Sequence, residues 1–540
     1  TMTTLEELGL LKMDFLGLRT LTVIRDALNL IEKNHNRKID FSKMDYDDPK
    51  VFELLSSGNT LGVFQLESAG MRVFMKQLKP DNFEDIVAGI SLYRPGPMDS
   101  IPTYIENKTN PQNVTYLHEK LKPIMEVTYG CLVYQEQVMQ VVRELGGYTY
   151  GRSDLVRRAM GKKKMDVMEE ERRYFVYGKE DENGNIEIAG CIRNGVPEDI
   201  ANQIFDDMID FAKYAFNKSH AAAYGVLSYQ TAYLKAYYPV EFMAALITSV
   251  MGNTDKVVEY IRECNALGIE VLKPDINKSF SKFSVEGNNI RFGLAAVKNV
   301  GVNIIENIIN ERNLNGEFVD FSDLAKRLDS KDTNKRVIES LIKCGAFDEI
   351  SENRASLMAG YENVLDSISM DRKKNVQGQI SLFDVFGASE ENNLQETNTI
   401  PKLPEYQERE KLSLEKEVLG MYVSGHPLSE FKEILTKNTS IDNGKLNSLK
   451  EDEESYLSLD ERDVIMGGMI ANKTIKTTKR NDIMAFLDLE DLYGNIEVIV
   501  FPQTLKKYNQ ILNEDSIIFI RGVLNIKEGE EPKIVARDIV

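Results

Sequence analysis

Cysteine and histidine are scarce in this chain of 540 residues, which has four of each. The cysteines are dispersed, and no two of them form a CxxC pair; they are Cys131, Cys191, Cys264 and Cys344. This spacing argues against a zinc site and a disulfide framework, and it fits reduced thiols in a cytoplasm. The dispersed histidines leave little material for a histidine-rich metal cluster.

Long apolar runs and a secretory start are also missing. No stretch approaches the roughly 18 uninterrupted apolar residues of a membrane span, so we expect no membrane segment. The opening TMTTLEELGL lacks the basic start and apolar stretch of a signal peptide. It also lacks an initiator Met, which suggests a fragment or a processed chain. The thiols and the missing signal together predict a cytoplasmic protein.

Basic charge is not in excess, because 85 acidic residues outnumber 66 basic ones and give a net charge of −19. This balance argues against indiscriminate binding to nucleic acid, although the local field along a groove decides binding there. Residues 151–164 (GRSDLVRRAMGKKK) are a local exception, with six basic residues and one acid. The sequence therefore allows a basic groove on an acidic body.

The chain is long enough for about three to five domains, at roughly 100–200 residues each. Hydrophobic periodicity predicts a short strand at 10–16 and a helix at about 20–34, with Thr20 as a cap. Residues from about 48 to 250 and from 255 to 350 are mainly helical in pattern.

Two boundaries inside the helical part are well marked. Ser219 can cap a helix that Pro239 prevents from continuing. The polar residues 180–185 (EDENGN) predict a short hairpin or a loop.

The last third of the chain changes in character. Residues from about 367 to 412 are polar and acidic, which predicts a flexible linker with one apolar island at 380–386. Short alternating segments then predict strands at 464–470, 485–489, 496–501, 516–523 and 533–539. Five short strands in about 75 residues are typical of a small barrel of the OB type.

Asp14 lies in the middle of the first predicted strand, in LLKMDFL. A carboxylate there can point to solvent or cap the following helix. It can also hold Mg²⁺, which proteins bind through a few carboxylates and substrate phosphates. The residue type alone leaves these alternatives open.

The basic segment and the start of the later helix are candidate anion sites. The adjacent Arg157 and Arg158 carry guanidinium groups that suit phosphate oxygens, although a solvated basic surface is the alternative. Lys218 and a hydroxyl at a helix N-terminus also suit an anion. His220 can reach a nucleotide there, or it can be a packed histidine.

Two further segments are typical of binding to macromolecules. Gly301 lies in a turn between two short helical patterns, which is similar to a helix-hairpin-helix that contacts a DNA phosphate through turn amides. Lys298 adds positive charge. Gln379, with Leu382 and Phe383 close behind, forms a docking peptide in the linker, unless the peptide packs back onto the chain.

Several segments together resemble one family. KMDFLGLRTLTVI closely resembles the last catalytic strand of the palm in bacterial DNA polymerase III alpha subunits of the DnaE type. The following segments are similar to the fingers domain of that family, in order: GVFQLES (62–68), RPGPM (94–98), YQEQVM (134–139), LVRRAMGKKK (155–164) and FNKSHAAAYGVLSYQ (216–230).

The resemblance implies roles for the candidate residues. Asp14 would be a catalytic carboxylate and a ligand of Mg²⁺. Residues implied to bind the incoming nucleotide are Lys12, Arg157, Arg158, Lys218 and His220. Residues expected to contact DNA are Lys162, Lys163, Lys298 and Gly301. The peptide of Gln379, Leu382 and Phe383 matches the sliding-clamp-binding motif of bacterial clamp clients.

The implied fold is multidomain and mainly α-helical, with a C-terminal β-barrel of the OB type and a remnant of an α/β palm. The expected parts are the end of the palm (1–20), fingers (21–250), a helix-hairpin-helix region (251–366), a linker with the clamp motif (367–412), a connecting segment (413–462) and the OB domain (463–540). A basic loop with nearby aromatic residues is expected to bind single-stranded DNA at the barrel, through Lys473, Lys476, Lys479, Arg480, Phe486 and Tyr493.

The implied function is template-directed DNA synthesis, with primer-template DNA, a deoxynucleoside triphosphate (dNTP), the sliding clamp and other polymerase III holoenzyme subunits as partners. Two-metal nucleotidyl transfer needs several carboxylates, so we expect the chain to be inactive alone. The alternative is a non-catalytic DNA- and clamp-binding subunit of a split or accessory polymerase. A DNA ligase, which shares the two DNA-binding modules, is set aside because a KxDG motif is missing.

Overall fold

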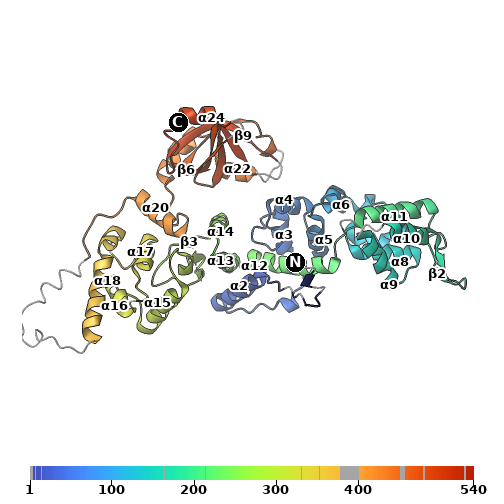
Figure 1. Cartoon of the computed structure of the whole chain (residues 1–540), viewed down its shortest axis with the longest axis horizontal. Helices are drawn as coiled ribbons and strands as arrows, with labels where there is room; N and C mark the ends of the chain where they lie inside the picture. The colour runs from blue at the N-terminus through green and yellow to red at the C-terminus, as the bar shows by residue number, and fades with distance from the viewer. Residues whose placement is uncertain are drawn as a thin grey trace, which may run out of the picture. The chain divides into compact units, whose positions relative to one another are not determined.

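The computed structural model describes the chain except for residues 1–3, 6–7, 12, 14, 162–164, 213–214, 330, 352, 377–399, 450–455, 478–480 and 528–530. The chain forms two compact units (Figure 1). The first consists of Thr1–Glu270 and Ser284–Ile290, and the second of Val271–Phe283 and Arg291–Val540. Helices make up most of the first unit, and the second unit combines helices with a β-barrel.

The first unit is a helical assembly. Its helices are α2 (Arg19–His35), α3 (Pro49–Ser57), α4 (Ala69–Leu78), α5 (Phe83–Leu92), α6 (Ile101–Thr109), α7 (Lys122–Met125), α8 (Gln135–Gly146), α9 (Tyr150–Gly161), α10 (Met165–Tyr177), α11 (Glu198–Ala212), α12 (Lys218–Tyr237), α13 (Pro239–Thr248) and α14 (Thr254–Ala266). The strands β1 (Lys179–Glu180) and β2 (Ile186–Ile188) pair as an antiparallel hairpin, as residues 180–185 predict.

Helix α12 is the element around which several others of the first unit pack. It contacts α2, α3, α5 and α13, and Figure 1 shows it among them. Gly225 explains the close approach of α5, because a Cβ atom there would lie 3.3 Å from Phe83 and Val87. The buried surface of α12 is therefore built from small side chains as well as large ones.

Two predicted helix caps are wrong. The first long helix begins at Arg19 with Leu18 as its N-cap, so Thr20 lies inside the helix. Helix α12 begins at Lys218, and the side chain of Asn217 accepts a hydrogen bond of 2.8 Å from the His220 N–H. Asparagine and serine are both good N-caps, and the position of Asn217 before the first helical residue decides between them. Pro239 begins α13, so the predicted end of α12 is confirmed.

The strand predicted at 10–16 is not formed by the residues described there. The side chain of Leu11 is 81% exposed and that of Phe15 is 89% exposed. A β-strand needs a neighbouring strand for its backbone hydrogen bonds, and none of the described strands pairs with this segment. The expected remnant of an α/β palm therefore has no sheet within the described residues.

The helical part of the second unit follows three short strands, two of which lie partly or wholly in the first unit: β3 (Val271–Leu272), β4 (Ser284–Glu286) and β5 (Asn289–Arg291). Its helices are α15 (Val302–Asn315), α16 (Phe321–Arg327), α17 (Lys335–Lys343), α18 (Arg354–Val376), α20 (Glu408–Leu419), α21 (Lys432–Asn438) and α22 (Asn443–Leu449). No described helix of the chain has the length and apolar character that crossing a membrane requires.

Residues 367–376, which were predicted to belong to the flexible linker, are helical, because α18 continues to Val376. The end of α18 is fixed by Arg372, whose guanidinium group donates hydrogen bonds to carbonyl groups of α16 and of Leu328. After the undescribed residues, Leu403 lies against the start of α18. Its carbonyl group accepts a 2.9 Å bond from the Asn353 side chain, and its N–H donates to the Ser356 hydroxyl at 2.9 Å. Both ends of this segment are therefore attached to α18.

A buried ion cluster joins α17, α18 and α20. Arg354, only 2% exposed, binds both carboxylate oxygens of Asp348 at 2.9 and 2.8 Å and one oxygen of Glu415 at 2.9 Å. Burial opposes the ionisation of Asp348, but the hydrogen bonds and charge of Arg354 outweigh it and lower the pKa of Asp348. Glu415 also accepts hydrogen bonds from the N–H and hydroxyl groups of Ser424. The cluster therefore satisfies its buried charges.

The second unit ends in a closed barrel with the strand order β10-β8-β7-β6-β9, and Figure 1 shows its curved strands. The strands are β6 (Asp463–Thr477), β7 (Ile483–Glu490), β8 (Asn495–Val500), β9 (Ile517–Asn525) and β10 (Lys533–Ile539). Each of the five predicted strands overlaps one of them. Helix α24 (Pro502–Tyr508), which the sequence pattern did not indicate, lies between β8 and β9 in the chain.

Replacing Arg354 with Ala is expected to destabilise the second unit by about 3–5 kcal/mol, because the buried Glu415 loses its cation and Asp348 keeps only Lys273, at 3.2 Å. Hydrogen exchange followed by mass spectrometry across α17 and α20 measures the effect. Lys335→Ala is the control, since Lys335 pairs with Glu362 and Asp366 at the surface and should change protection little. Equal loss of protection in the two variants would contradict the assigned role of the cluster.

Candidate nucleotide and nucleic-acid interface

Arg157 and Arg158 share one carboxylate on α9. Asp154 lies three and four residues before them, so all three side chains meet on one face of the helix. The Nε and Nη2 atoms of Arg157 donate to Asp154 Oδ1 at 2.9 and 2.7 Å. Arg158 Nη2 lies 2.7 Å from Asp154 Oδ2. The hydrogen bond from Arg157, together with the charges of both arginines, outweighs the opposing effect of burial and lowers the pKa of Asp154.

Gln135 connects this arginine pair to the start of α12. The side-chain oxygen of Gln135 accepts a 2.9 Å hydrogen bond from Arg157 Nη1. The Gln135 side-chain nitrogen donates to the Ala215 carbonyl at 3.0 Å, and its backbone N–H donates to the Phe216 carbonyl at 2.8 Å. Tyr134 and Phe216 form a parallel β-bridge at the same place. Segments about 80 residues apart are thereby held together.

The N-terminus of α12 is occupied by a carboxylate from α8. Both oxygens of Glu136 lie within hydrogen-bond distance of the Lys218 N–H, at 3.2 and 3.0 Å. One of them also accepts a 3.0 Å bond from the Asn217 side chain. A carboxylate is favourable at this position because the first N–H groups of a helix lack partners within the helix.

The cation of Lys218 is also paired. Lys218 Nζ lies 2.9 Å from Glu84 Oε2 and 5.2 Å from the centre of the Tyr134 ring. Nearby, the Arg94 guanidinium lies 3.9 Å from the centre of the Phe216 ring, and burial lowers the pKa of Arg94. These contacts place the RPGPM, YQEQVM and FNKSH segments next to one another.

His220 is exposed in the first turn of α12 rather than packed in the core. Its ring lies against two aromatic rings, with centre distances of 5.4 Å to Phe216 and 4.3 Å to Tyr224. An exposed imidazole beside aromatic rings can contact a bound nucleotide base or a phosphate. The structure therefore leaves His220 accessible to a ligand.

The structure brings four of the predicted nucleotide-binding residues, namely Arg157, Arg158, Lys218 and His220, into one region of the first unit. Together they present guanidinium, ammonium and imidazole groups, which suit a phosphate-bearing ligand. The sequence analysis assigned no role to Asp154, Gln135, Glu136 or Arg94. The signal for Asp154 was its helical spacing before the arginines, whereas the other three lie in motifs that were quoted without roles.

The remaining predicted residues of the catalytic, basic and clamp-binding segments lie outside the described residues. They are Lys12, Asp14, Lys162, Lys163, Gln379, Leu382 and Phe383. Among the residues that are described, no group of three or more His, Cys, Asp or Glu side chains could hold a metal ion. Burial raises the pKa of Cys131 to about 11 and those of Cys191, Cys264 and Cys344 to about 12, so these thiols stay protonated at neutral pH.

At the predicted helix-hairpin-helix turn, Gly301 has free space around it, whereas Lys298 is hydrogen-bonded. Gly301 is the N-cap of α15, and a Cβ atom there would meet nothing within 4 Å. Lys298 donates from its backbone N–H to the Val418 carbonyl at 2.9 Å and from Nζ to the Glu417 carbonyl at 3.0 Å. The first helical pattern of the hairpin is a 3₁₀ turn, Leu294–Ala296. The turn at Gly301 is therefore accessible, whereas Lys298 is bound to the end of α20.

On the barrel, Lys473 and Lys476 belong to strand β6, so the prediction that they line a loop is wrong; the strand simply extends to Thr477. Lys473 Nζ binds the Asn509 side chain at 3.1 Å, and Lys476 Nζ lies 4.6 Å from the centre of the Phe486 ring. Tyr493, in the turn between β7 and β8, is 51% exposed. Lys479 and Arg480 lie outside the described residues.

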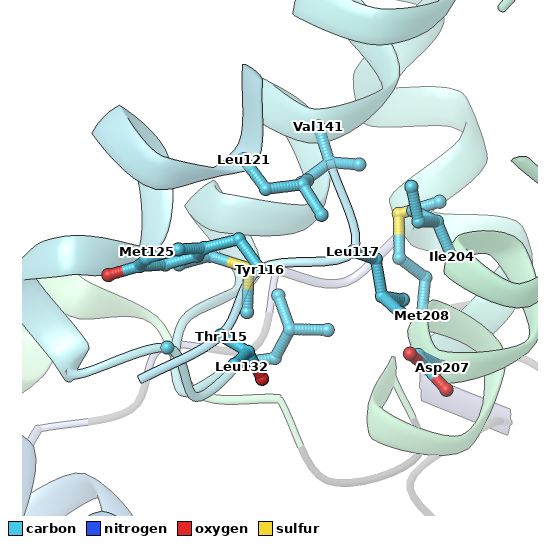
Figure 2. Close-up of a pocket in the computed structure, with 11 residues that line it drawn as sticks. Thr115, Tyr116, Leu117, Leu121, Met125, Leu132, Val141, Ile204, Asp207 and Met208 are labelled. Carbon is cyan, nitrogen blue, oxygen red and sulfur yellow. The ribbon is translucent and has the colours of Figure 1, made fainter. Parts of the chain in front are cut away.

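A separate small pocket lies between the loop at 115–132, α8 and α11, and Figure 2 shows its lining. Its volume is about 100 Å³, and its walls are mainly apolar, with Leu117, Val141 and Met208 among them. Asp207 is its charged group, and burial together with the neighbouring acids Asp206 and Asp210 raises the pKa of Asp207. Ligand sites usually measure about 300–1,000 Å³, and no cation lines this pocket, so it does not suit a nucleotide.

Comparisons with known proteins match the chain in three places. Residues 20–183 match the bacterial DNA polymerase III alpha subunit finger domain, residues 268–357 a helix-hairpin-helix motif, and residues 464–540 an OB-fold nucleic acid binding domain.

Curated relatives match over nearly the whole chain. DNA polymerase III subunit alpha of Bacillus subtilis is 40% identical over 99% of this chain and 45% of its own length. The proteins of the same name from Borreliella burgdorferi and Thermus aquaticus are 41% and 42% identical over 99% of the chain, with 45% and 42% of their lengths covered. The chain thus spans less than half the length of these relatives.

Replacing Glu136 with Ala is expected to destabilise the start of α12 by about 0.5–2 kcal/mol, the usual range for loss of a helix N-terminal partner. Hydrogen exchange of the first-turn amides of α12 measures the loss. Glu144→Ala on the same helix is the matched control, because Glu144 is an exposed residue of α8. Unchanged exchange at α12 in the Glu136 variant would rule out this role.

Proposed function

Because the chain belongs to the family of bacterial DNA polymerase III alpha subunits, we propose that it takes part in template-directed DNA synthesis, in which a nucleotide is transferred from a dNTP to a primer. The observation that carries the proposal is the convergence of Arg157, Lys218 and His220 through Gln135 and Glu136. Arg157 comes from one motif, and Lys218 and His220 come from a second; the family resemblance assigns these residues to the nucleotide site.

The incoming dNTP is bound by this group of residues. Arg157 and Arg158 bind the triphosphate, since their planar donor groups match phosphate oxygens in pairs. Lys218 supplies a second positive charge at the start of α12. His220, exposed beside Tyr224, contacts the nucleotide, and Lys12 is a further phosphate contact by the family resemblance. The exposed positions of Arg158 and His220 support this assignment.

Asp14 is the one Mg²⁺ ligand in the proposal. The described residues offer no carboxylate cluster that fits the ion, and Asp14 is not among them. Mg²⁺ would supply charge stabilisation for phosphoryl transfer, which requires several carboxylates around the ions. We therefore expect the 540 residues alone to bind their ligands without extending a primer.

DNA is bound by three parts of the chain. The turn at Gly301 binds a phosphate of the primer-template duplex through its backbone, which its open surroundings support. Lys162 and Lys163 bind the same duplex. Lys298 contributes positive charge near the turn, while its ammonium group stays bound to α20. The barrel binds single-stranded DNA, with Phe486 and Tyr493 as stacking surfaces and Lys473 and Lys476 as nearby charges.

The sliding clamp is bound by the peptide of Gln379, Leu382 and Phe383, whose apolar side chains enter a pocket of the clamp. Binding to the clamp keeps the polymerase on DNA, and other polymerase III holoenzyme subunits complete the assembly in the bacterial cytoplasm. The alternative function is that of a non-catalytic DNA- and clamp-binding subunit. Such a subunit would make the same contacts with DNA and the clamp but would not synthesise DNA.

Primer extension with Mg²⁺ and four dNTPs tests the synthesis. The chain should extend a primer only when the preceding part of an alpha subunit is supplied. Replacing Arg157 and Arg158 with Ala should then raise the KM for dNTP by more than about 100-fold, since each arginine loses at least one hydrogen bond to a charged group, worth about 1.5–3 kcal/mol. Arg193→Ala is the control, because Arg193 pairs with Glu180 at the β1–β2 hairpin. No extension by the complemented chain, with DNA binding intact, would favour the non-catalytic alternative.

Clamp binding is tested by replacing Gln379, Leu382 and Phe383 with Ala. Affinity for the sliding clamp, measured by surface plasmon resonance, should fall more than about 10-fold, because buried anchor residues at interfaces commonly contribute 2 kcal/mol or more. Leu394→Ala with Gln395→Ala is the matched control in the same segment. An unchanged affinity in the triple variant would remove the clamp from the proposal.

A further inference from the structure

We propose that Asp154 is an internal counter-ion that holds Arg157 and Arg158 in place and is displaced by the triphosphate of the incoming nucleotide. The inference rests on the proposed function, in which the two arginines bind that triphosphate. It adds a positioning residue that competes with the ligand for the same donors.

The geometry shows one carboxylate serving two guanidinium groups. Asp154 Oδ1 accepts bonds from Nε and Nη2 of Arg157 at 2.9 and 2.7 Å, and Asp154 Oδ2 lies 2.7 Å from Nη2 of Arg158. Both oxygens of the carboxylate are therefore engaged. The hydrogen bonding and the positive charges lower the pKa of Asp154, so it is ionised at neutral pH.

A phosphate group needs the same donors. A guanidinium group binds a carboxylate or a phosphate through a pair of N–H groups, and the Nε and Nη2 pair of Arg157 already binds Asp154. The side chains of Arg158 and Asp154 are 63% and 29% exposed, so solvent weakens their pairing. A triphosphate carries more charge than one carboxylate and can replace it.

Gln135 keeps Arg157 in position during this exchange. Its side-chain oxygen binds Arg157 Nη1, an atom that does not contact Asp154 in the structure. Gln135 is itself held by the Ala215 and Phe216 carbonyl groups. The departure of Asp154 therefore leaves Arg157 anchored to α8, with its Nε and Nη2 donors free for phosphate.

The carboxylate of Asp154 therefore offsets positive charge of the two arginines before a ligand binds. Without the carboxylate, two adjacent arginines would repel each other and attract any anion. With it, an anion must outcompete Asp154 before it binds. The carboxylate thus lowers affinity for every phosphate ligand in exchange for arginines that are already oriented.

The experiment measures the binding of dATP and of inorganic tripolyphosphate to the 540-residue chain by isothermal titration calorimetry. Asp154→Asn should tighten the binding of both ligands by about 3- to 10-fold, the gain expected when one or two exposed ion pairs no longer compete. Asp154→Glu, which restores a carboxylate, should return the affinity toward that of the original chain. Asp206→Asn is the control with the same change in charge, because Asp206 pairs with Arg172 away from this site.

The outcomes separate this inference from the proposed function. If the Arg157→Ala, Arg158→Ala chain loses dATP affinity while Asp154→Asn leaves it unchanged or weaker, the counter-ion role is wrong and the nucleotide site stands. If the double arginine variant binds dATP as well as the original chain, the nucleotide site and the counter-ion role both fail. Asp154→Ser, checked with Asp154→Asn for its circular dichroism melting curve, gives a second folded variant for the same comparison.

Discussion

The candidate site depends on one backbone hydrogen bond between Gln135 and Phe216. The 2.8 Å hydrogen bond from the Gln135 N–H to the Phe216 carbonyl joins the starts of α8 and α12. Gln135 then orients Arg157, and its neighbour Glu136 binds the Lys218 N–H. Because the two side chains project from adjacent residues of α8, a single backbone contact places donors from α9 and α12 in one region.

Arg157, Arg158 and Lys218 each lie beside a carboxylate of the same unit. Asp154 binds the arginine pair, and Glu84 lies beside Lys218. Such pairing reduces the local positive charge that these three residues present to a polyanion. It also limits the flexibility of long side chains before a ligand arrives, which lowers the entropy lost on binding.

The sequence predicted those features that depend on local chemistry. The barrel strands follow from alternating apolar residues. In the turn between β7 and β8, the Asp491 carboxylate accepts hydrogen bonds from the N–H groups of Tyr493 and Gly494, which is a local interaction typical of aspartate in turns. The contact between Arg157 and Gln135 could not be predicted, because it joins residues 22 positions apart through tertiary packing. The cap at Asn217 was missed for a smaller reason, since Asn217 and Ser219 are both suitable residues and only the backbone conformation distinguishes them.

The contacts of Arg372 and Leu403 limit how far the segment between them can reach. The chain leaves the end of α18 at Val376 and returns to the start of the same helix by Leu403. The 26 residues between them have a contour length of roughly 90 Å at about 3.5 Å per residue. A protein bound at the middle of this segment therefore stays within roughly 45 Å of the ends of α18.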